Sequence, residues 1–215
     1  MPRLKLTRRE FLKVTGAVGG GLLMGIHLGG CEEKSAITAT STIPQTPTTT
    51  DFDPNVWLTI APDESIHIRF ARSEMGQGVM TALPMLIAEE LDADWSKVQA
   101  EFAPVNPAFA NPIFGRQQTG GSTAIRGYWM LLREAGAVAR EMLISAAAQT
   151  WGISTQDCEA NNGQVINSVT GKRLSYGELA TLAATLPVPD AAFLKEPDEF
   201  KLLGKSQPRL DGPAK

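Results

Sequence analysis

Two glycine-bearing segments give this 215-residue chain its clearest chemistry. Each of them, Gly76–Gly78 and Thr119–Thr123, stands between extended chain and a helical pattern. Glycine lets a ligand approach the backbone closely, and the first amides of a helix are unpaired and lie at the positive end of its dipole. This chemistry suits a phosphate or pyrophosphate. The residues expected to bind it are Gly76, Gln77, Gly78, Gly120, Gly121, Ser122 and Thr123.

Either segment alone is also typical of a plain connection before a helix, because glycine often marks a turn. The cofactor interpretation gains its weight from the presence of two such segments in one domain. It also makes a geometric demand. The turns at Gln77 and Ser122 must lie side by side and share one hollow, so that their amides reach the same charged group.

The elements that position the first segment follow from hydrophobic periodicity. Alternating apolar residues predict a β-hairpin from Val56 to Ala61 and from Ser65 to Ala71, with its turn at Pro62-Asp63-Glu64. A helix is expected from about Val79 to Leu91, and a third strand from Val98 to Ala103. The first glycine segment therefore links the hairpin to a helix.

The second segment follows a long predicted loop, Pro104 to Gln118, whose length suggests a functional or interface role. A helix capped by Ser122 or Thr119 is expected to run to about Trp151. The remaining elements are strands at Cys158–Asn161 and Gln164–Asn167 around an Asn-Gly turn, and a helix that begins at a Ser175/Glu178 capping box and stops at Pro187. The predicted fold class is α+β, with short mixed or antiparallel strands, one long helix and two shorter helices.

Three arginines recur every seven residues along the long helix, at Arg126, Arg133 and Arg140. Side chains at this spacing line up on one face. A solvated stripe, paired with Glu134 and Glu141, is the favoured interpretation.

Other titratable residues give little sign of a site. Glu89 and Glu90 lie within a predicted helix, where solvation or packing accounts for them, and His67 is expected at a solvated or edge position. Residues 1–30 hold five of the 20 basic and one of the 23 acidic side chains, which leaves the rest of the chain at a formal charge of −7. This charge argues against nucleic acid as a partner. With Cys158 as the one cysteine after Cys31, no His/Cys metal cluster is available.

The N-terminus resembles a signal peptide of the twin-arginine export route. Arg8 and Arg9 are followed by Phe-Leu-Lys, and the apolar run from Val14 to Leu28 is too short and too rich in glycine for a membrane-spanning helix. That route carries folded proteins, so we expect passage through the twin-arginine translocase to the periplasm, with a cofactor installed beforehand.

The run ends at Leu28-Gly29-Gly30-Cys31, which resembles a lipobox. Lipidated Cys31 would hold the protein on a membrane surface without spanning it. Ordinary cleavage nearby, with Cys31 as an incidental thiol, is the alternative. The Ser/Thr/Pro-rich residues that follow cannot bury enough apolar surface to fold and are expected to form a flexible tether.

A family resemblance supports the cofactor interpretation. The segment Ser73–Thr81, the Ala88–Leu91 segment that follows and Thr119–Thr123 resemble the molybdopterin-binding large subunits of the xanthine dehydrogenase/aldehyde oxidase family. The isoquinoline 1-oxidoreductase β-subunit branch matches best, and the resemblance extends from about Val56 to Lys215.

The resemblance implies hydroxylation of an N-heteroaromatic or aldehyde carbon at a molybdenum centre, with water as the oxygen source. It implies molybdopterin in its cytosine dinucleotide form, with the seven glycine-segment residues around its phosphates. The partner would be a small subunit that carries the iron–sulfur clusters, with a cytochrome as a further candidate. The implied divisions are a signal peptide (1–30), a flexible linker (31–53), a partial molybdopterin-binding domain (54–189) and a connector to a next domain (190–215).

One departure from the family is length. The glutamate that acts as general base in such enzymes belongs to a C-terminal part that this sequence does not include, so we expect an N-terminal fragment without a complete active site and assign no catalytic residue or metal ligand. Two other interpretations stay open. The chain could be an exported, lipid-anchored module that binds an anion without catalysis, or an interaction protein whose long helix docks on another subunit.

Overall fold

The computed structural model describes residues 52–212, which form two small sheets and three α-helices. In the first sheet the strands lie in the order β1-β2-β3-β4. They are β1 (Phe52–Asn55), β2 (Leu58–Ile60), β3 (Ile66–Phe70) and β4 (Val98–Phe102). The first three pair antiparallel, and β4 pairs parallel to β3. Because β3 and β4 are parallel, their carboxyl ends meet at one edge of the sheet.

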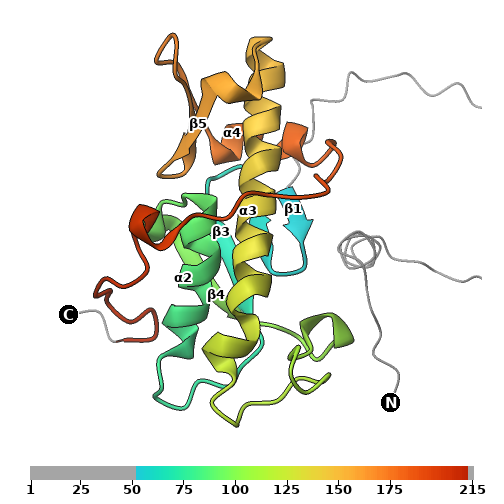
Figure 1. The fold of residues 1–215 in the computed structure, drawn as a ribbon, viewed down its shortest axis with the longest axis vertical. Helices are drawn as coiled ribbons and strands as arrows, with labels where there is room; N and C mark the ends of the chain where they lie inside the picture. The colour runs from blue at the N-terminus through green and yellow to red at the C-terminus, as the bar shows by residue number, and fades with distance from the viewer. Residues whose placement is uncertain (1–51, 213–215) are drawn as a thin grey trace, which may run out of the picture.

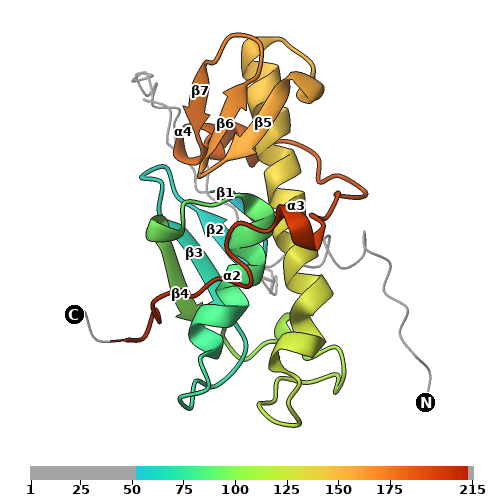
Figure 2. The same cartoon turned by 60° about the vertical axis from the view of Figure 1, so that its left-hand side comes forward.

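Both glycine segments follow this edge. After β3, the first segment leads into α2 (Val79–Leu91), which returns the chain to the start of β4. After β4, the long loop and the second segment lead into α3 (Ala124–Trp151). Figures 1 and 2 show both segments at the same end of the molecule, where α2 and α3 begin.

Helices α2 and α3 pack closely against each other beside the sheet. Gly136 makes this contact possible, because a Cβ atom there would lie 2.4 Å from the carbonyl oxygen of Ile87. The apolar residues of β3, such as Ile66 and Ile68, are buried in the same core as Leu86 of α2. The crossing of the two helices thus fixes how far apart the two glycine segments lie.

The second sheet covers the far end of α3 together with the last helix (Figure 2). Its antiparallel strands are β5 (Cys158–Asn161), β6 (Gln164–Asn167) and β7 (Arg173–Ser175). The last helix is α4 (Tyr176–Ala183), and the predicted capping box is present. The short 3₁₀ turns are η1 (Trp95–Lys97), η2 (Pro107–Phe109), η3 (Thr155–Asp157) and η4 (Pro197–Glu199).

The predicted α+β class, the hairpin, the long helix and the two shorter helices are confirmed. Several boundaries are wrong. The linker predicted to end at residue 53 overlaps β1, whose Phe52 is fully buried in the core. Strand β7 was not predicted, and α4 ends at Ala183, before Pro187. At the start of α3, Thr123 occupies the N-cap position and makes no side-chain capping bond, so neither Ser122 nor Thr119 caps this helix.

The predicted solvation of the arginine stripe is wrong for two of its three members, although Nη2 of Arg140 does lie 3.7 Å from Oε1 of Glu141, one of the predicted partners. Arg133 and Arg140 are buried, and both bind Glu90 rather than solvent. The Nε of Arg133 donates to Glu90 Oε1 at 2.7 Å, and Nη1 of Arg140 donates to the Glu90 carbonyl at 2.6 Å. Only Arg126 is exposed. Because the arginines face α2, they join the two helices.

Of the segment predicted as a connector, the described residues 190–212 pack back on the domain and cross α2 and α3 (Figure 1). Buried Glu89 holds it, accepting hydrogen bonds from the amides of Leu202 at 2.6 Å and Leu203 at 2.8 Å. The Nζ of Lys195 also contacts Glu89, at 3.2 Å. Packing therefore accounts for both glutamates of α2. Across residues 52–212, no helix has the length and apolarity needed to cross a membrane.

Candidate functional site

The two glycine segments adjoin at the carboxyl edge of β3 and β4. The amide of Ser73 donates to Thr119 Oγ1 at 2.8 Å, which ties the start of the first segment to the start of the second. One residue earlier, Nη2 of Arg72 lies 3.2 Å from Thr123 Oγ1. These contacts bring the two segments together at their starts, whereas a hollow shared by Gln77 and Ser122 stays a prediction. The residues predicted in the export signal and at the lipidation site, Arg8, Arg9 and Cys31, lie outside the described residues.

The first segment, which we call the Gln77 loop (residues 73–78), is closed on itself. Its glycines adopt left-handed backbone, with φ of 97° at Gly76 and 84° at Gly78, the N-cap of α2. The Gln77 side chain accepts from the amide of Met75 and donates to the carbonyl of Ser73 at 2.7 Å. Its amide group therefore serves the loop rather than an open surface.

A carboxylate of the protein occupies the helix N-terminus in this loop. Glu74 accepts hydrogen bonds from the amides of Gly76 at 2.8 Å, Gly78 at 3.0 Å and Met80 at 2.9 Å. These bonds, with those from Met80 and Gly78 the strongest, hold the pKa of Glu74 below its ordinary value. The two glycine amides predicted to bind a phosphate are thus already satisfied by Glu74.

The C-terminal segment braces the same loop from outside. Arg209 donates through Nη1 to the carbonyl of Gly76 at 3.0 Å and through Nη2 to Glu74 Oε1 at 3.3 Å. The next amide, of Leu210, donates to Thr81 Oγ1 at 2.9 Å. The conformation of the Gln77 loop is therefore coupled to residues far away in the sequence.

The second segment, which we call the Ser122 loop (residues 119–123), is open. Gly120, Gly121 and Ser122 are exposed, and the amides of Gly121, Ser122 and Ile125 have no hydrogen-bond acceptor within residues 52–212. Ser122 has a φ of 50°, a left-handed conformation rare for a residue other than glycine. These amides at the start of a 28-residue helix are free to bind an anion.

Thr123 differs from its neighbours because it is fully buried and structural. Its Oγ1 donates to the carbonyl of Gly120 at 2.9 Å and accepts from Nδ2 of Asn111 at 2.8 Å. Arg126 closes the outer side, with Nη2 3.0 Å from the carbonyl of Gly121. Thr123 therefore shapes the Ser122 loop, and Gly121 and Ser122 present its amides.

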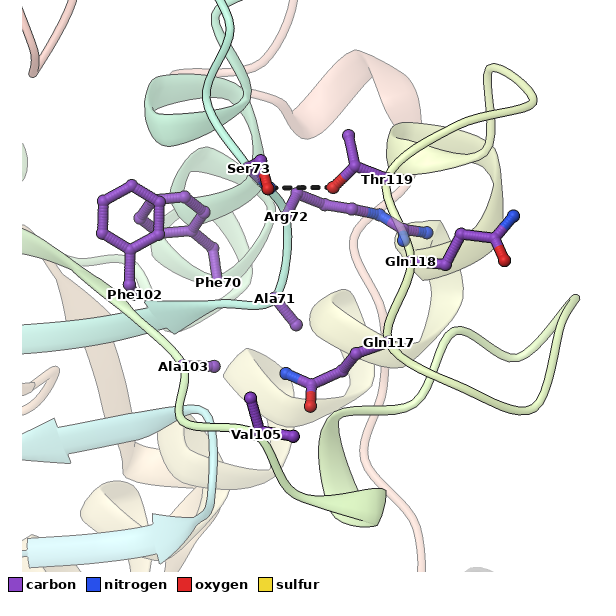
Figure 3. A pocket seen from close by; sticks show the side chains of 10 residues that line it. All are labelled: Phe70, Ala71, Arg72, Ser73, Phe102, Ala103, Val105, Gln117, Gln118 and Thr119. Atoms are coloured by element: carbon purple, nitrogen blue, oxygen red, sulfur yellow. Dashed lines mark hydrogen bonds between the residues drawn. The ribbon is translucent and has the colours of Figure 1, made fainter.

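A cavity of about 210 Å³ lies between the end of the sheet and the chain that precedes the Ser122 loop (Figure 3). None of the seven predicted site residues lines it, although Ser73 and Thr119, which flank them, do. Its walls are Phe70, Ala71, Arg72, Ser73, Phe102, Ala103, Val105, Gln117, Gln118 and Thr119.

Arg72 is the one charged residue of this wall, and it was missed from the sequence. Only 3% of it is exposed, its guanidinium stacks on the Tyr128 ring at 4.7 Å, and its Nε and Nη1 atoms are buried with no hydrogen-bond partner among the described residues. The sequence does contain a signal for this role of Arg72. An arginine directly after the apolar end of a strand, and just before a glycine segment, is poorly explained by solvation.

The exposed face of the first sheet carries a second polar cluster around His67. Nδ1 of His67 lies 2.6 Å from Glu101 Oε1, and Nε2 lies 3.1 Å from Ser65 Oγ. The Ser65 hydroxyl donates to Asp63 at 2.6 Å. Because that carboxylate holds the hydroxyl proton, this serine is not activated by His67. His67 faces away from the core as predicted, but it is paired rather than free in solvent.

The comparisons with known proteins agree with this arrangement. Residues 13–209 match the model of the molybdopterin cofactor-binding domain family. The chain is 31% identical, over 99% of its length, to the isoquinoline 1-oxidoreductase subunit beta of Brevundimonas diminuta. It is 33% identical, over 98% of its length, to a membrane-bound aldehyde dehydrogenase (pyrroloquinoline-quinone) of Gluconacetobacter polyoxogenes. It spans 31% and 26% of these two relatives.

Among solved structures, the comparison finds quinoline 2-oxidoreductase from Pseudomonas putida 86. It is 17% identical and has a TM-score of 0.46, over 63% of this chain and 17% of that chain. The family match covers residues 52–209 of the described part, both glycine loops included. The chain belongs to the molybdopterin cofactor-binding domain family and is related to the large subunits of molybdenum hydroxylases.

Proposed function

We propose that this chain holds part of a molybdopterin cofactor, in its cytosine dinucleotide form, as a segment of a molybdenum hydroxylase large subunit. The observation that carries the proposal is the Ser122 loop. Its unpaired amides lie at the start of α3, one contact away from the buried and unpaired guanidinium of Arg72. Backbone N–H groups at a helix N-terminus beside a cation match a phosphate-bearing group.

The residues fit this cofactor unequally. Gly121 and Ser122 offer free donors, and Thr123 and Asn111 hold those donors in place from behind. The Gln77 loop offers no free glycine amide at positions 76 and 78, because Glu74 binds both. We therefore assign anion binding to the Ser122 loop, and we assign to the Gln77 loop the part of a rigid wall beside it.

The cofactor would supply a molybdenum centre for oxidation of an N-heteroaromatic or aldehyde carbon, with water as the oxygen source. In this proposal the chain's own residues bind and orient the cofactor's anionic part, and none of them transfers a proton. Electrons would pass to an iron–sulfur partner subunit, for which a cytochrome is a further candidate. The relative named isoquinoline 1-oxidoreductase subunit beta, itself one subunit of an assembly, supports the search for such a partner, and co-purification of an iron–sulfur protein tests it.

A change at Gly121 tests the proposal. Gly121 has a φ of 63°, and a Cβ atom there would lie 3.1 Å from the Phe114 ring. Gly121→Val should therefore distort the Ser122 loop and remove most of the molybdenum and pterin from the purified full-length protein. Gly171→Val is the matched control, since Gly171 has a φ of 72° in an open turn of the second sheet. Equal metal content in the two variants, measured by mass spectrometry per polypeptide, would refute the assignment.

Export through the twin-arginine route, with Cys31 lipidated, is a further proposal that rests on the sequence around Arg8 and Arg9. Such an anchor is also compatible with a second function, that of a membrane-anchored module that binds an anion without catalysis. The open amides of the Ser122 loop suit either function. Retention of the protein in the cytoplasm of export-competent cells would exclude both the route and the anchor. Purified protein that contains bound phosphate but no molybdenum would favour the second function.

A further inference from the structure

Arg72 is a buried cation without a counter-ion. It is 3% exposed, and no carboxylate oxygen of residues 52–212 lies within 4.0 Å of its guanidinium. Its Nη2 contacts neutral acceptors, Thr123 Oγ1 at 3.2 Å and the Thr123 carbonyl at 3.4 Å. Nε and Nη1 have no hydrogen-bond partner among the residues that the structure describes. Burial of an unpaired charge with unsatisfied donors is strongly unfavourable, so an anion is expected to compensate it.

The ring of Tyr128 offsets only part of this cost. The guanidinium lies 4.7 Å from its centroid, a cation–π contact that uses the face of the guanidinium and provides no hydrogen-bond acceptor for Nε and Nη1. The Tyr128 hydroxyl donates to the carbonyl of Phe109 at 2.9 Å, and neither Nε nor Nη1 of Arg72 makes a hydrogen bond to its oxygen. The two free N–H groups of Arg72 therefore still need an acceptor.

The cavity lies next to Arg72, which is the one charged residue of its wall. Val105 and Phe102 on the same wall are largely exposed, whereas Arg72 is buried. Figure 3 shows the Arg72 side chain extending from the end of β3 towards the 117–119 segment. The Gln117 side chain is neutral. Its amide group is also already bound, because it donates to the Pro104 carbonyl and accepts from the Asn106 amide. Arg72 is thus the group that would select a ligand here.

We propose that Arg72 is the counter-cation of a phosphate-type group, which binds beside this cavity through the unpaired guanidinium N–H groups, next to the Ser122 loop that Arg72 contacts at Thr123. The inference rests on the proposed function, and it names the residue that neutralises the charge of the cofactor's anionic part. A guanidinium presents a planar fork that binds two oxygens of a phosphate at once, which lysine does not reproduce.

Thermal unfolding of the full chain without cofactor tests the inference, with inorganic pyrophosphate as the probe and sodium chloride at equal ionic strength as the reference. Pyrophosphate well above its dissociation constant should raise the melting temperature by about 5 °C or more. In Arg72→Met the apparent affinity should fall at least ~10-fold. Arg173→Met removes an exposed arginine from β7 and should behave like the parent chain.

Arg72→Met should fold, since an apolar side chain in place of an unpaired buried charge is neutral or stabilising. Should it not fold, Arg72→Lys decides the question, because it keeps the charge but loses the fork and should weaken pyrophosphate binding several-fold. Three outcomes overturn the inference. These are no pyrophosphate-dependent shift in the parent chain, an equal shift in the Arg72 variant that folds, and an equal shift with sodium acetate, which would make the site one for carboxylates.

The inference and the proposed function fail in distinguishable ways. Loss of molybdenum in Gly121→Val, together with pyrophosphate binding that ignores Arg72, would keep the cofactor assignment and remove Arg72 from it. Unchanged molybdenum in Gly121→Val, together with pyrophosphate binding that requires Arg72, would leave an anion site without the molybdenum function.

Discussion

The Gln77 loop and the Ser122 loop begin as the same motif and end as different structures. Both are glycine segments at the start of a helix, and both follow a strand of the parallel pair β3 and β4. In the Gln77 loop the helix N-terminus is filled by Glu74, and Arg209 braces it from outside. In the Ser122 loop the corresponding amides have no acceptor within residues 52–212.

The difference follows from the nearest acidic residue. Glu74 stands two residues before Gly76, at the spacing that lets its carboxylate fold back on the first amides of the helix. No acidic residue occurs between Glu101 and Glu134, a stretch that contains the whole Ser122 loop. A glycine segment before a helix therefore signals an open anion site only where no carboxylate of the chain is close enough to fill it.

The largest expected effect comes from the contact that positions both loops. Gly136→Val places a side chain where a Cβ atom already lies 2.4 Å from the backbone oxygen of Ile87. The helices must move apart, which should lower the free energy of unfolding by about 3 kcal/mol. Urea denaturation measures this loss. Ser145→Ala on the same helix removes a hydroxyl that binds only its own helix and should change little. Equal stability of the two variants would show that the helix crossing does not fix the loops.

A smaller effect should follow from opening the Gln77 loop. Glu74→Gln replaces one acceptor oxygen by an amide that cannot accept from the helix N-terminus. Exchange of the Gly76, Gly78 and Met80 amides should become faster, on the order of 10-fold, whereas exchange around Ser122 should stay the same. Hydrogen exchange resolved by residue measures both loops in one experiment. A uniform increase across the domain would mean that Glu74 stabilises the fold as a whole rather than this loop.

Acid should have the same local effect. The pKa of Glu74 is lower in the folded chain than its ordinary value of 4.5, because the amides bind the charged form. The stabilisation is thus fully present above that ordinary value and is lost as the pH falls through the lower folded pKa. The Gln77 loop should stay protected at pH 5 and open at a pH well below 4.5, and Glu74→Gln should abolish this dependence.

The sequence predicts local elements well and long-range ionic contacts poorly. The limits of α2, β5 and β6 match, because hydrophobic period and turn chemistry are local. The roles of Arg133 and Arg140 do not match, because their partner Glu90 is 43 and 50 residues away along the chain. A stripe at a spacing of seven shows which side chains share a face, but it does not show whether that face meets water or another helix.

The candidate site divides in the same way. The glycine segments and their nearness could be predicted from their residue types and from two helices that begin beside one sheet edge. That Glu74 fills the Gln77 loop follows from a turn geometry that glycine leaves undetermined. Arg72 was not predicted, because the feature that distinguishes it is the lack of any carboxylate within 4.0 Å of its guanidinium in the described residues. Only three-dimensional packing reveals such an unpaired charge.

The smallest effect should come from the bond that joins the two loops. Thr119→Val removes the acceptor of the Ser73 amide and should cost at most about 1 kcal/mol, since that amide is exposed and can bind water. Thr185→Val is the control, because its hydroxyl bonds only within the end of its own helix region. Exchange of the Ser73 amide should become faster in Thr119→Val alone.

Cofactor retention in Thr119→Val then shows whether the Ser122 loop needs the Gln77 loop to bind its anion. If the Gln77 loop serves as a rigid wall for the Ser122 loop, removing the bond between the Ser73 amide and the Thr119 hydroxyl should reduce bound molybdenum in the full-length protein far more than it reduces stability. If molybdenum content follows stability in this variant, the Ser122 loop binds its anion independently, and the closed Gln77 loop matters only for the fold.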